Sequence, residues 1–565
     1  MSDTQERLSI IRGIPLAEEK GTGALTLGGY IRELTERYGP REAANLRLGD
    51  SIERWTYDEL WARSVQVAKS LLAMGLTRGT RVGIMMTNRL EFLSATFGTA
   101  LAGGVATTLS TFSTQPELEV ILEKSCCSYI LFERNVLKKD FAAMLVEAEP
   151  GLATARPGEL QSEKFPFLRY AAAVDSDDLP TGMETWQQFL ARGADISDAL
   201  VDATAATVTP ADPGVLFFSS GSTGKPKGIL SAHRGVTLQL WRWAQWLGFG
   251  EEGVRSWSAN GFFWSGNFAM GIGGALSVGG TLILQRTFDP EDAVDLMHAE
   301  GATYLFAWPH QWKQLMDAPN WLTTDLSSLK YVDKDSPIAQ HPDIEPGDYT
   351  EPAAAYGNTE TFTLSTVFPA NTPKDVVGGS HGKPAAGNII KIVDPMSGET
   401  VPLGETGEIA VKGATLMLGY VGIPLDESVD EQGFFRTGDG GYVDEEGRLF
   451  WHGRLNDIIK TGGANVSPIE VDTVLATYPG IKIPRCVGVP DELLGEVVVA
   501  CIVPQTGVEL DGEAIRAFLK ERLASFKIPR KFLFFTEEEL ETTGSSKIKL
   551  ETLRKLATDR LAAEG

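Results

Sequence analysis

Residues 215–230 read VLFFSSGSTGKPKGIL and form the most informative stretch of the chain. An apolar run typical of a buried strand passes directly into a loop of small, hydroxyl-bearing and basic residues. Small residues let backbone N–H groups converge on a phosphate, while hydroxyls add donors and lysines add charge. The residues expected to contact phosphate are Ser219, Ser220, Gly221, Ser222, Thr223, Gly224, Lys225 and Lys227. The stretch therefore predicts a polyphosphate-binding loop at the end of a strand, against the alternative of a flexible surface turn.

The regions around this loop predict an α/β fold with a parallel sheet. Helix-like and strand-like patterns alternate over residues 57–132 and again over residues 281–308, which is typical of doubly wound sheets. After about residue 374 short strands broken by Gly and Pro indicate a β subdomain, and the last stretch is mixed. We expect a large N-terminal domain, residues 1–454, and a small α+β C-terminal domain, residues 455–565.

Composition narrows the class of partner. A chain of 565 residues exceeds the size of one hydrophobic core, and 43% hydrophobic with 22% charged residues is ordinary for a globular protein. The formal net charge of −24 opposes nucleic-acid binding, because that affinity depends on Lys and Arg neutralising phosphates. A small anionic ligand remains compatible, because a local pocket of backbone donors can override the global charge.

The cysteines and the N-terminus predict a reducing, cytoplasmic location. The four cysteines, at 126, 127, 486 and 501, show neither metal-ligand spacing nor a disulfide framework. The start, MSDTQERLSI, has no apolar core after a basic head, so it does not read as a secretory signal. Residues 256–285 are uncharged and long enough to cross a bilayer, but seven glycines favour a close-packed buried element instead.

The phosphate loop is not a P-loop, because no Ser or Thr follows a Gly-Lys pair at the required spacing. Its residue order instead resembles the signature of acyl-adenylate-forming enzymes, which include acyl-CoA synthetases, peptide-synthetase adenylation domains and firefly luciferase. The resemblance extends over roughly residues 25–555. It implies substrates ATP and coenzyme A, bound Mg²⁺ and a mobile C-terminal domain.

The pentapeptide YGNTE, residues 356–360, looks like the family's aromatic-Gly-x-Thr-Glu motif. The resemblance implies that Tyr356 stacks on adenine, that Thr359 contacts the α-phosphate and that Glu360 holds Mg²⁺ together with Thr223. A carboxylate-held Mg²⁺ would neutralise the departing pyrophosphate. The resemblance places Gly357, Asn358 and Ser336 in the same nucleotide site.

Residues 434–472 resemble the family's ribose-binding and hinge region over nearly their full length. Asp439 is expected to accept hydrogen bonds from the ribose hydroxyls, a task that suits a carboxylate, and Arg454 is expected to contact ribose too. Asn456 is the expected hinge. Beyond it, Lys460, Gly462 and Gly463 are expected to admit the thiol arm of coenzyme A.

Near the C-terminus, residues 544–549 read GSSKIK. In the family a lysine just before an isoleucine is catalytic, which maps to Lys547, although Lys549 is a rival. An ammonium can bridge the substrate carboxylate and the α-phosphate and offset charge that builds in the transition state.

The acyl pocket is expected at GFFWSGNFAMG, residues 261–271. Trp264 stands where many relatives carry histidine, and we expect Phe263, Trp264, Gly266 and Trp308 to line an apolar pocket. The segment contains no acid to pair with a substrate ammonium, so an α-amino acid substrate is disfavoured.

Three further positions depart from the family pattern. VDKDSPIA, residues 332–339, replaces a glycine-rich run and leaves the pocket floor open to question, because Lys334 and Asp335 are bulky and charged. Asn456 and Ser546 also differ from the common residues. Every charged catalytic group is retained, so we expect an active enzyme whose acid cannot be copied from a relative.

The predicted function is an AMP-forming carboxylate-CoA ligase for an apolar or aromatic acid. One alternative is a free-standing adenylation enzyme that loads a carrier protein or closes a β-lactone, and another is a non-catalytic nucleotide-binding regulator. The acid and the oligomeric state, a homodimer included, stay open.

Overall fold

The computed structural model describes residues 7–219, 226–250, 253–352, 354–457, 459–461, 464–491, 494–523, 527–541 and 548–564. Contacts divide the chain into two compact units. The large unit contains Arg12–Ile389 and Val411–Phe435, and the small unit contains Met1–Ile11, Ile390–Ala410 and Arg436–Gly565.

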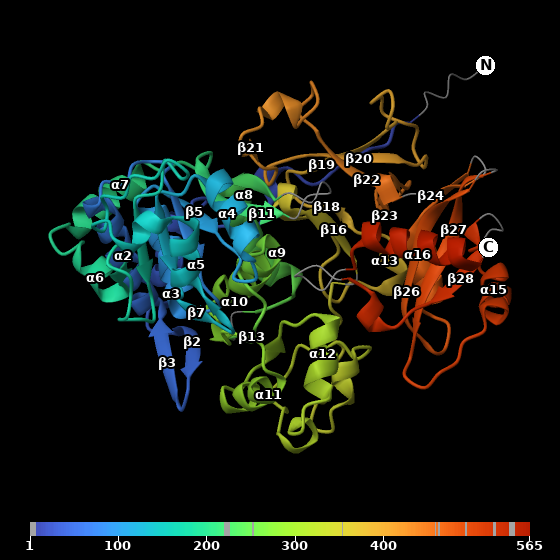
Figure 1. Cartoon of the computed structure of the whole chain (residues 1–565), viewed down its shortest axis with the longest axis horizontal. Helices are drawn as coiled ribbons and strands as arrows, with labels where there is room; N and C mark the ends of the chain where they lie inside the picture. The colour runs from blue at the N-terminus through green and yellow to red at the C-terminus, as the bar shows by residue number, and fades with distance from the viewer. Residues whose placement is uncertain are drawn as a thin grey trace. The chain divides into compact units, whose positions relative to one another are not determined.

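An eight-stranded sheet organises the large unit (Figure 1). Its strands run parallel as far as β11, and β12 and β21 then pair antiparallel at one edge. In spatial order the strands are β10 (Glu184–Thr185), β9 (Tyr170–Ala173), β6 (Tyr129–Phe132), β4 (Arg81–Met85), β5 (Val105–Thr108), β11 (Pro213–Ser219), β12 (Lys227–Ala232) and β21 (Gly419–Tyr420). The parallel part confirms the predicted doubly wound fold.

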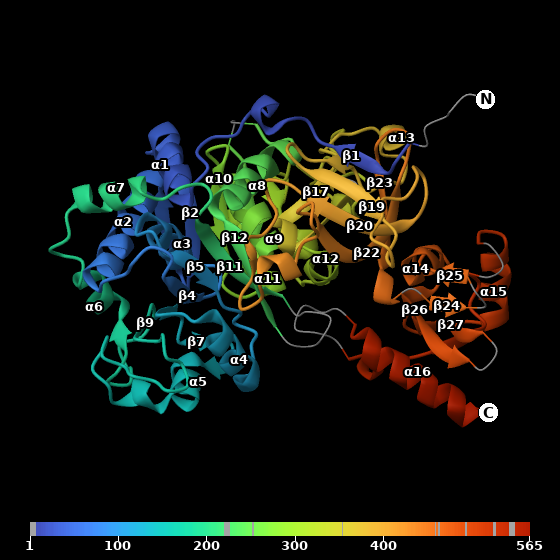
Figure 2. The ribbon, with the colours of Figure 1, turned by 90° about the horizontal axis from the view of Figure 1, so that it is seen from above.

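A second, five-stranded sheet shares helices with the first. Thr56 begins helix α2 with a capping box that uses Glu59, and α2 packs on α3 within one continuous apolar core. Figure 2 shows α8 beside β11 and β12, which agrees with their contacts. The strands are β15 (Tyr304–Leu305), β13 (Arg255–Ser258), β14 (Thr281–Leu284), β2 (Glu42–Leu48) and β3 (Ser51–Thr56), and the helices are α1 (Leu27–Tyr38), α2 (Tyr57–Ala73), α3 (Leu90–Leu101) and α8 (His233–Trp246).

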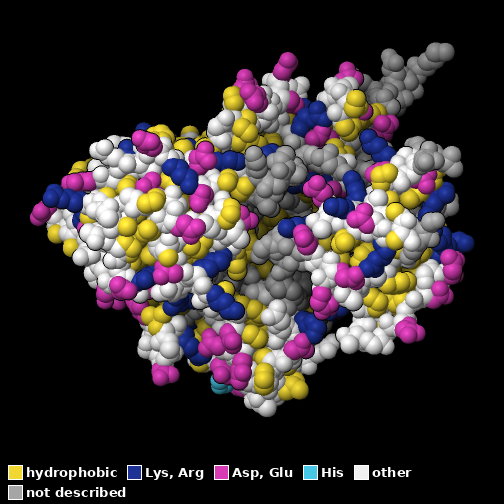
Figure 3. All heavy atoms as spheres, in the orientation of Figure 1, with side chains coloured by type: hydrophobic (Ala, Val, Ile, Leu, Met, Phe, Trp, Pro, Cys, Tyr) yellow, Lys and Arg dark blue, Asp and Glu magenta, His cyan; other side chains and the backbone are white. Residues whose placement is uncertain are grey.

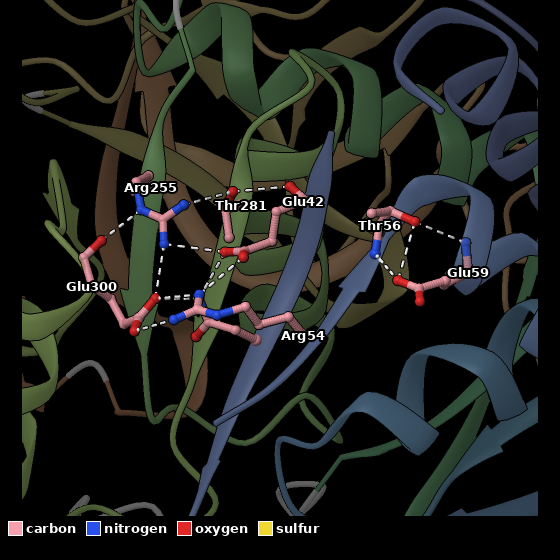
Figure 4. A network of polar contacts seen from close by, with 8 residues as sticks. Glu42, Arg54, Thr56, Glu59, Arg255, Thr281 and Glu300 are labelled. Carbon is pink, nitrogen blue, oxygen red and sulfur yellow. Dashed lines mark hydrogen bonds and ion pairs between the residues drawn. The ribbon is translucent and has the colours of Figure 1, made fainter. Parts of the chain in front are cut away.

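A network of ion pairs connects side chains from several strands of this second sheet (Figure 4). Arg54 binds both oxygens of Glu300 at 2.7 Å, and Arg255 bridges Glu300 and Glu42 at 3.0 and 3.1 Å. The Glu300 side chain is only 3% exposed, so the two arginines compensate a carboxylate that has left water. The network therefore links β2 and β3 to β13 by charge across the intervening strand β14.

The uncharged residues 256–285 fold into short elements between two strands. After β13 come α9 (Ser265–Asn267), the π-helical turn η3 (Phe268–Gly273) and α10 (Gly274–Leu276), before β14. A Cβ on Gly273 would meet the backbone of Leu240 at 2.6 Å, so this glycine lets the segment lie directly against α8. Over the part of the chain that the structure describes, no helix combines the length and the apolar character needed to cross a membrane.

The remaining elements of the large unit connect these sheets. They are α4 (Gln115–Ser125), β7 (Asn135–Val136), β8 (Lys139–Asp140), α5 (Phe141–Ala148), α6 (Trp186–Ala191), α7 (Asp198–Ala206), α11 (Pro290–Ala299), α12 (Pro309–Met316), β16 (Ala355–Asn358), β17 (Thr363–Val367), α13 (Lys374–Val377) and β18 (Lys383–Pro384). Strands β16, β17 and β18 form a three-stranded antiparallel sheet.

The small unit contains most of a five-stranded β-sheet and a mixed α+β part, whereas the sequence analysis expects the β subdomain within the large N-terminal domain. The first sheet has the order β1 (Ile10–Arg12), β19 (Ile389–Val393), β20 (Gly407–Lys412), β22 (Phe435–Val443) and β23 (Leu449–Arg454). The second has the order β25 (Ala464–Val466), β24 (Ile459–Thr461), β27 (Gly495–Pro504) and β26 (Ile481–Asp491), with β28 (Lys531–Phe534) beside β27. Its helices are α14 (Pro468–Leu475), α15 (Gly512–Lys520) and α16 (Leu550–Glu564).

The division into units differs from the expected domain division. Met1–Ile11, Ile390–Ala410 and residues 436–454 belong to the small unit, whereas the sequence suggests a boundary after residue 454. The expected domain boundary at residue 454 stays a prediction.

Candidate functional site

The predicted phosphate loop connects two paired strands. β11 and β12 form an antiparallel hairpin in which Ser219 is opposite Lys227, so the loop leaves and re-enters the sheet at one point. Ser220, Gly221, Ser222, Thr223, Gly224 and Lys225 lie outside the described residues. Lys124 of α4 donates to the Pro226 carbonyl oxygen at 2.7 Å, which brings a further cation to the base of the loop. Sequence reasoning missed Lys124, because it comes from a distant helix.

The YGNTE pentapeptide forms a capped turn. Asn358 ends β16, and its side-chain oxygen accepts from the Thr361 amide at 3.0 Å, which closes the 3-10 turn η6 (Thr359–Thr361). A Cβ on Gly357 would meet the Thr363 carbonyl oxygen at 1.7 Å, so only glycine fits there. Tyr356 is 4% exposed. These contacts account for the turn, and the nucleotide contacts expected of Tyr356, Gly357 and Asn358 stay predictions.

Glu360 is held by the segment around β21. The Tyr420 hydroxyl donates to Glu360 Oε1 at 2.8 Å, and the Met417 amide donates to the Glu360 carbonyl oxygen at 2.7 Å. The Lys227 ammonium lies 5.2 Å from the centre of the same Tyr420 ring. Pairing of β12 with β21 thus brings a cation, a carboxylate and a phenol together near the phosphate loop. Tyr420 went unpredicted, because no spacing rule connects it to residues 356–360.

Lys334 and Asp335, the bulky charged residues within residues 332–339, lie at the protein surface. Asp335 pairs with Lys374 at 2.7 Å, and the two side chains are 56% and 80% exposed. Lys334 is exposed as well. Ser336 caps the short turn η5 (Pro337–Gln340), and its expected role at the nucleotide stays a prediction. Figure 3 shows acidic and basic side chains intermixed over the face that it draws.

A half-buried carboxyl group lies in the chain that leads to β16. Burial and, as the smaller cause, the nearby carboxylate of Asp333 raise the pKa of Glu351 to about 7. The Glu351 amide donates to Asp333 Oδ2 at 3.0 Å, which joins this chain to residues 332–339. This carboxyl group is therefore partly protonated near neutral pH.

Aromatic rings dominate the predicted acyl segment. The rings of Phe263 and Trp264 lie 4.7 Å apart at 58°, and Phe112 stacks on Trp264 at 5.8 Å and 22°. Phe112 also meets Phe263 edge-on at 5.6 Å. A Cβ on Gly266 would meet nothing within 4 Å, so there is open space next to this cluster. Sequence reasoning identified Phe263, Trp264 and Gly266 but missed Phe112.

One hydrogen bond links the aromatic segment to the YGNTE turn. Ser265, the residue after Trp264, is buried, and its hydroxyl lies 3.4 Å from the Thr359 hydroxyl. The structure therefore brings two distant predicted motifs together. Trp308 lies at the start of α12 against Phe306, with 41% of its surface exposed, and its place in an acyl pocket stays a prediction.

The two residues expected at ribose face each other in the small unit. Asp439 of β22 is opposite Arg454 of β23, and Arg454 Nε lies 3.1 Å from Asp439 Oδ1. Arg454 also donates to the Thr437 carbonyl oxygen at 2.8 Å. The Asp439 side chain is 5% exposed and that of Arg454 is 52% exposed, so the arginine orients a mostly buried carboxylate.

The expected hinge and thiol-path residues are only partly described. Asn456 lies in the turn η8 (Leu455–Asp457), with its side chain outside the description. Gly462 and Gly463 are not described, but β24 and β25 on either side pair with Thr461 opposite Ala464. The Lys460 amide donates to Glu496 at 2.8 Å. The hinge role of Asn456 and the thiol-path roles of Lys460, Gly462 and Gly463 stay predictions.

Lys547 also lies outside the described residues. The chain on either side of it is joined, because the Lys549 amide donates to the Glu541 carbonyl oxygen at 2.9 Å. The rival Lys549 forms an ion pair with Glu541 at 3.3 Å. Lys549 therefore has a partner at the base of the segment that carries Lys547.

The donors near Glu360 suit Mg²⁺ better than a transition metal. Within the described ranges no group of three or more His, Cys, Asp or Glu side chains could hold a metal ion. Mg²⁺ keeps several waters and is usually bound by one or two carboxylates together with substrate phosphates. A single oriented carboxylate beside a phosphate loop fits that pattern.

Comparison with known proteins places the chain in a family. Residues 32–421 match the AMP-binding enzyme family, and residues 470–547 match the AMP-binding enzyme C-terminal domain. The chain belongs to the AMP-binding enzyme family, as the sequence motifs predict.

Curated relatives include acyl-CoA ligases of cyclic acids. A methyl-dioxo-octahydro-indenyl propanoyl:CoA ligase of Mycobacterium tuberculosis is 32% identical over 517 residues, 89% of this chain and 94% of the relative. A feruloyl-CoA synthase of Amycolatopsis sp is 31% identical over 499 residues, 87% and 92% of the two chains. The anthranilate CoA ligase AuaEII is similar in structure, with a TM-score of 0.76 and 22% identity over 97% of this chain and 99% of that chain. This last likeness confirms the fold.

Proposed function

We propose that the protein is an AMP-forming ligase that joins an apolar or aromatic carboxylic acid to coenzyme A. The carboxylate oxygen attacks the α-phosphorus of ATP, and pyrophosphate leaves. The thiol sulfur of coenzyme A then attacks the carbonyl carbon of the acyl-adenylate, its proton passes to solvent, and AMP leaves with the electron pair of the broken C–O bond.

The observation that carries this proposal is the contact between Ser265 and Thr359 at 3.4 Å. Thr359 belongs to the turn expected at the α-phosphate. Ser265 follows Trp264, which forms an aromatic wall together with Phe112 and Phe263. An acid whose body lies against that wall would have its carboxylate beside the phosphate-binding turn. Holding two reactants in this geometry lowers the barrier by removing the entropy cost of their encounter.

The chain's own residues supply the rest of the adenylation chemistry. Lys227 contributes positive charge beside the phosphate loop, and Tyr420 orients the carboxylate of Glu360. Mg²⁺, when bound, supplies charge neutralisation, and Glu360 and Thr223 are the residues that would hold it. Lys547 would bridge the acid and the α-phosphate, where a fixed ammonium offsets developing negative charge.

Two arguments support an apolar, ring-bearing acid. The aromatic wall presents the rings of Phe112 and Trp264. Residues 261–271 contain no carboxylate that could pair with a substrate ammonium. Relatives above 30% identity include proteins named for a feruloyl group and for a fused-ring propanoyl group. Acids with a planar or cyclic body are therefore the first to test.

The test is a product assay with purified protein, ATP, Mg²⁺ and a panel of aryl, fused-ring and fatty acids. We expect pyrophosphate release with a ring-bearing acid, turnover that depends on coenzyme A, and an acyl-CoA product by mass spectrometry. Adenylate that accumulates and is not consumed by coenzyme A would overturn the proposed acceptor and favour a carrier protein. Failure of every acid to release pyrophosphate would overturn the ligase itself.

A further inference from the structure

A short turn between β5 and α4 contributes a ring to the aromatic wall. Phe112 lies in this turn and is 46% exposed, which is high for a phenylalanine. The Thr108 hydroxyl at the end of β5 donates to the Phe263 carbonyl oxygen at 3.2 Å. The turn and the acyl segment are therefore joined at a buried hydrogen bond, although they are about 150 residues apart in the sequence.

Phe112 completes a three-ring cluster that is open on one side. Its ring stacks on Trp264 and meets Phe263 edge-on, while Phe263 and Trp264 also contact each other. Phe263 is 4% exposed and forms the base of the cluster, so Phe112 and Trp264 form its accessible part. Open space lies at Gly266, two residues after Trp264.

The turn that carries Phe112 is clamped from another element. Lys139 of β8 donates to the carbonyl oxygens of Thr111 and Ser113 at 3.2 and 2.8 Å, on either side of Phe112. The Phe112 amide donates to the Ser110 hydroxyl at 3.1 Å. Partial burial lowers the pKa of Lys139, because its ammonium has lost part of its contact with water.

We propose that Phe112 determines the acid specificity of this site, with Lys139 as the positioning residue that holds its turn. The proposal rests on the proposed function. The Phe112 ring lies on Trp264 and occupies volume that the body of a larger acid would need. Because the clamp keeps the turn in place, the size limit is sharp.

The accessible rings indicate the class of acid. Phe112 and Trp264 offer stacking faces to a planar group. The substrate we infer is a carboxylic acid with a planar or cyclic apolar body.

The test measures kcat/KM for a graded series of ring-bearing acids, from one ring to fused rings. Phe112→Ala should raise the ratio of kcat/KM for the largest acid over the smallest by at least about ten-fold, with the KM for ATP unchanged. Lys139→Met keeps the ring but releases the turn, so it should broaden the preference by a smaller factor. Lys139→Arg should restore most of the parent preference.

Two controls keep the proposal falsifiable. Phe167→Ala removes a similarly exposed ring, 55% exposed, from the loop before β9, and should leave the preference unchanged. Because Phe112 and Trp264 are in contact, their two Ala substitutions should combine non-additively. If the parent converts acids but Phe112→Ala keeps its preference, this inference is wrong and the ligase assignment stands. If the parent converts no acid, the assignment itself fails.

Discussion

Two side-chain sets in the large unit meet at the Ser265–Thr359 contact but are held by different forces. The polar set, Lys227, Glu360 and Tyr420, is fixed by a directed hydrogen bond and a cation over a ring. The aromatic set, Phe112, Phe263 and Trp264, is fixed by ring contacts that have broad minima.

The difference separates chemistry from selectivity. A hydrogen bond weakens steeply with angle, so the polar set tolerates little change and suits a step that is the same for every acid. Ring packing is non-directional by comparison, so a ring can be replaced by another apolar group and the pocket changes shape but keeps its character. Substitutions in the polar set should change rates, and those in the aromatic set should change preferences.

The largest effects should come from residues that the small unit supplies. Lys547→Ala should lower adenylate formation by about 1000-fold, because a charge that stabilises the transition state is lost, but should still let coenzyme A react with adenylate supplied ready-made. Gly463→Ile should do the reverse by obstructing the thiol path. Pre-steady-state measurement of each half-reaction separates the two.

Lys549→Ala is the matched control for Lys547→Ala. Lys549 is the neighbouring lysine and pairs with Glu541, so its loss should leave adenylation close to the parent rate. Equal losses in both half-reactions for Lys547→Ala and Gly463→Ile would contradict separate roles of Lys547 in adenylation and of Gly463 in thiol transfer.

The second prediction concerns the polar set. Glu360→Gln keeps an oxygen but removes the charge, so adenylation should fall by about 100-fold at low Mg²⁺ and recover in part at high Mg²⁺. Titration of pyrophosphate release against Mg²⁺ measures this. An unchanged Mg²⁺ dependence would refute the role of Glu360.

Tyr420→Phe sharpens the same prediction, because it removes only the hydroxyl that orients Glu360. We expect a rise of about five-fold in the Mg²⁺ needed for half-maximal rate, with a small loss of maximal rate. Tyr442→Phe, whose ring stacks on Phe450 in the small unit, is the control and should behave like the parent.

The third prediction concerns the aromatic set. Trp264→Ala should shift preference toward bulkier acids by about ten-fold while the KM for ATP stays the same. Trp308→Ala tests whether that residue belongs to the same pocket, since it should then shift preference in the same direction. A change in ATP binding without a change in preference would contradict the separation between the two sets.

The smallest effect on catalysis is expected at Glu351. Its pKa is raised from 4.5 to about 7 in the folded protein, so the folded state binds more protons than the unfolded chain between these values. Folding stability should therefore fall as pH rises through this window, by up to about 3 kcal/mol. Glu351→Gln should remove this dependence and raise the thermal midpoint at pH 8, with kcat unchanged. Identical melting profiles for mutant and parent from pH 5 to pH 8 would contradict it.

Local patterns predicted much of the secondary structure, because they are short-range physics. The helix at residues 57–73 follows from its capping residues and apolar spacing, and the strand at residues 81–85 follows from an apolar run. The β11–β12 hairpin was not predicted as such, because an antiparallel pair at the edge of a parallel sheet depends on partners far along the chain.

The family, the fold class and the motif residues follow from the amino-acid order, because Gly, Pro and charged residues in a fixed order leave few chemical alternatives. The contacts between these residues follow from the packing of distant elements. Ser265 and Thr359 are 94 residues apart, Tyr420 and Glu360 are 60 apart, and Lys139 holds the turn of Phe112 from another element. Such contacts form when packed strands close the loops between them, and no local propensity encodes that closure.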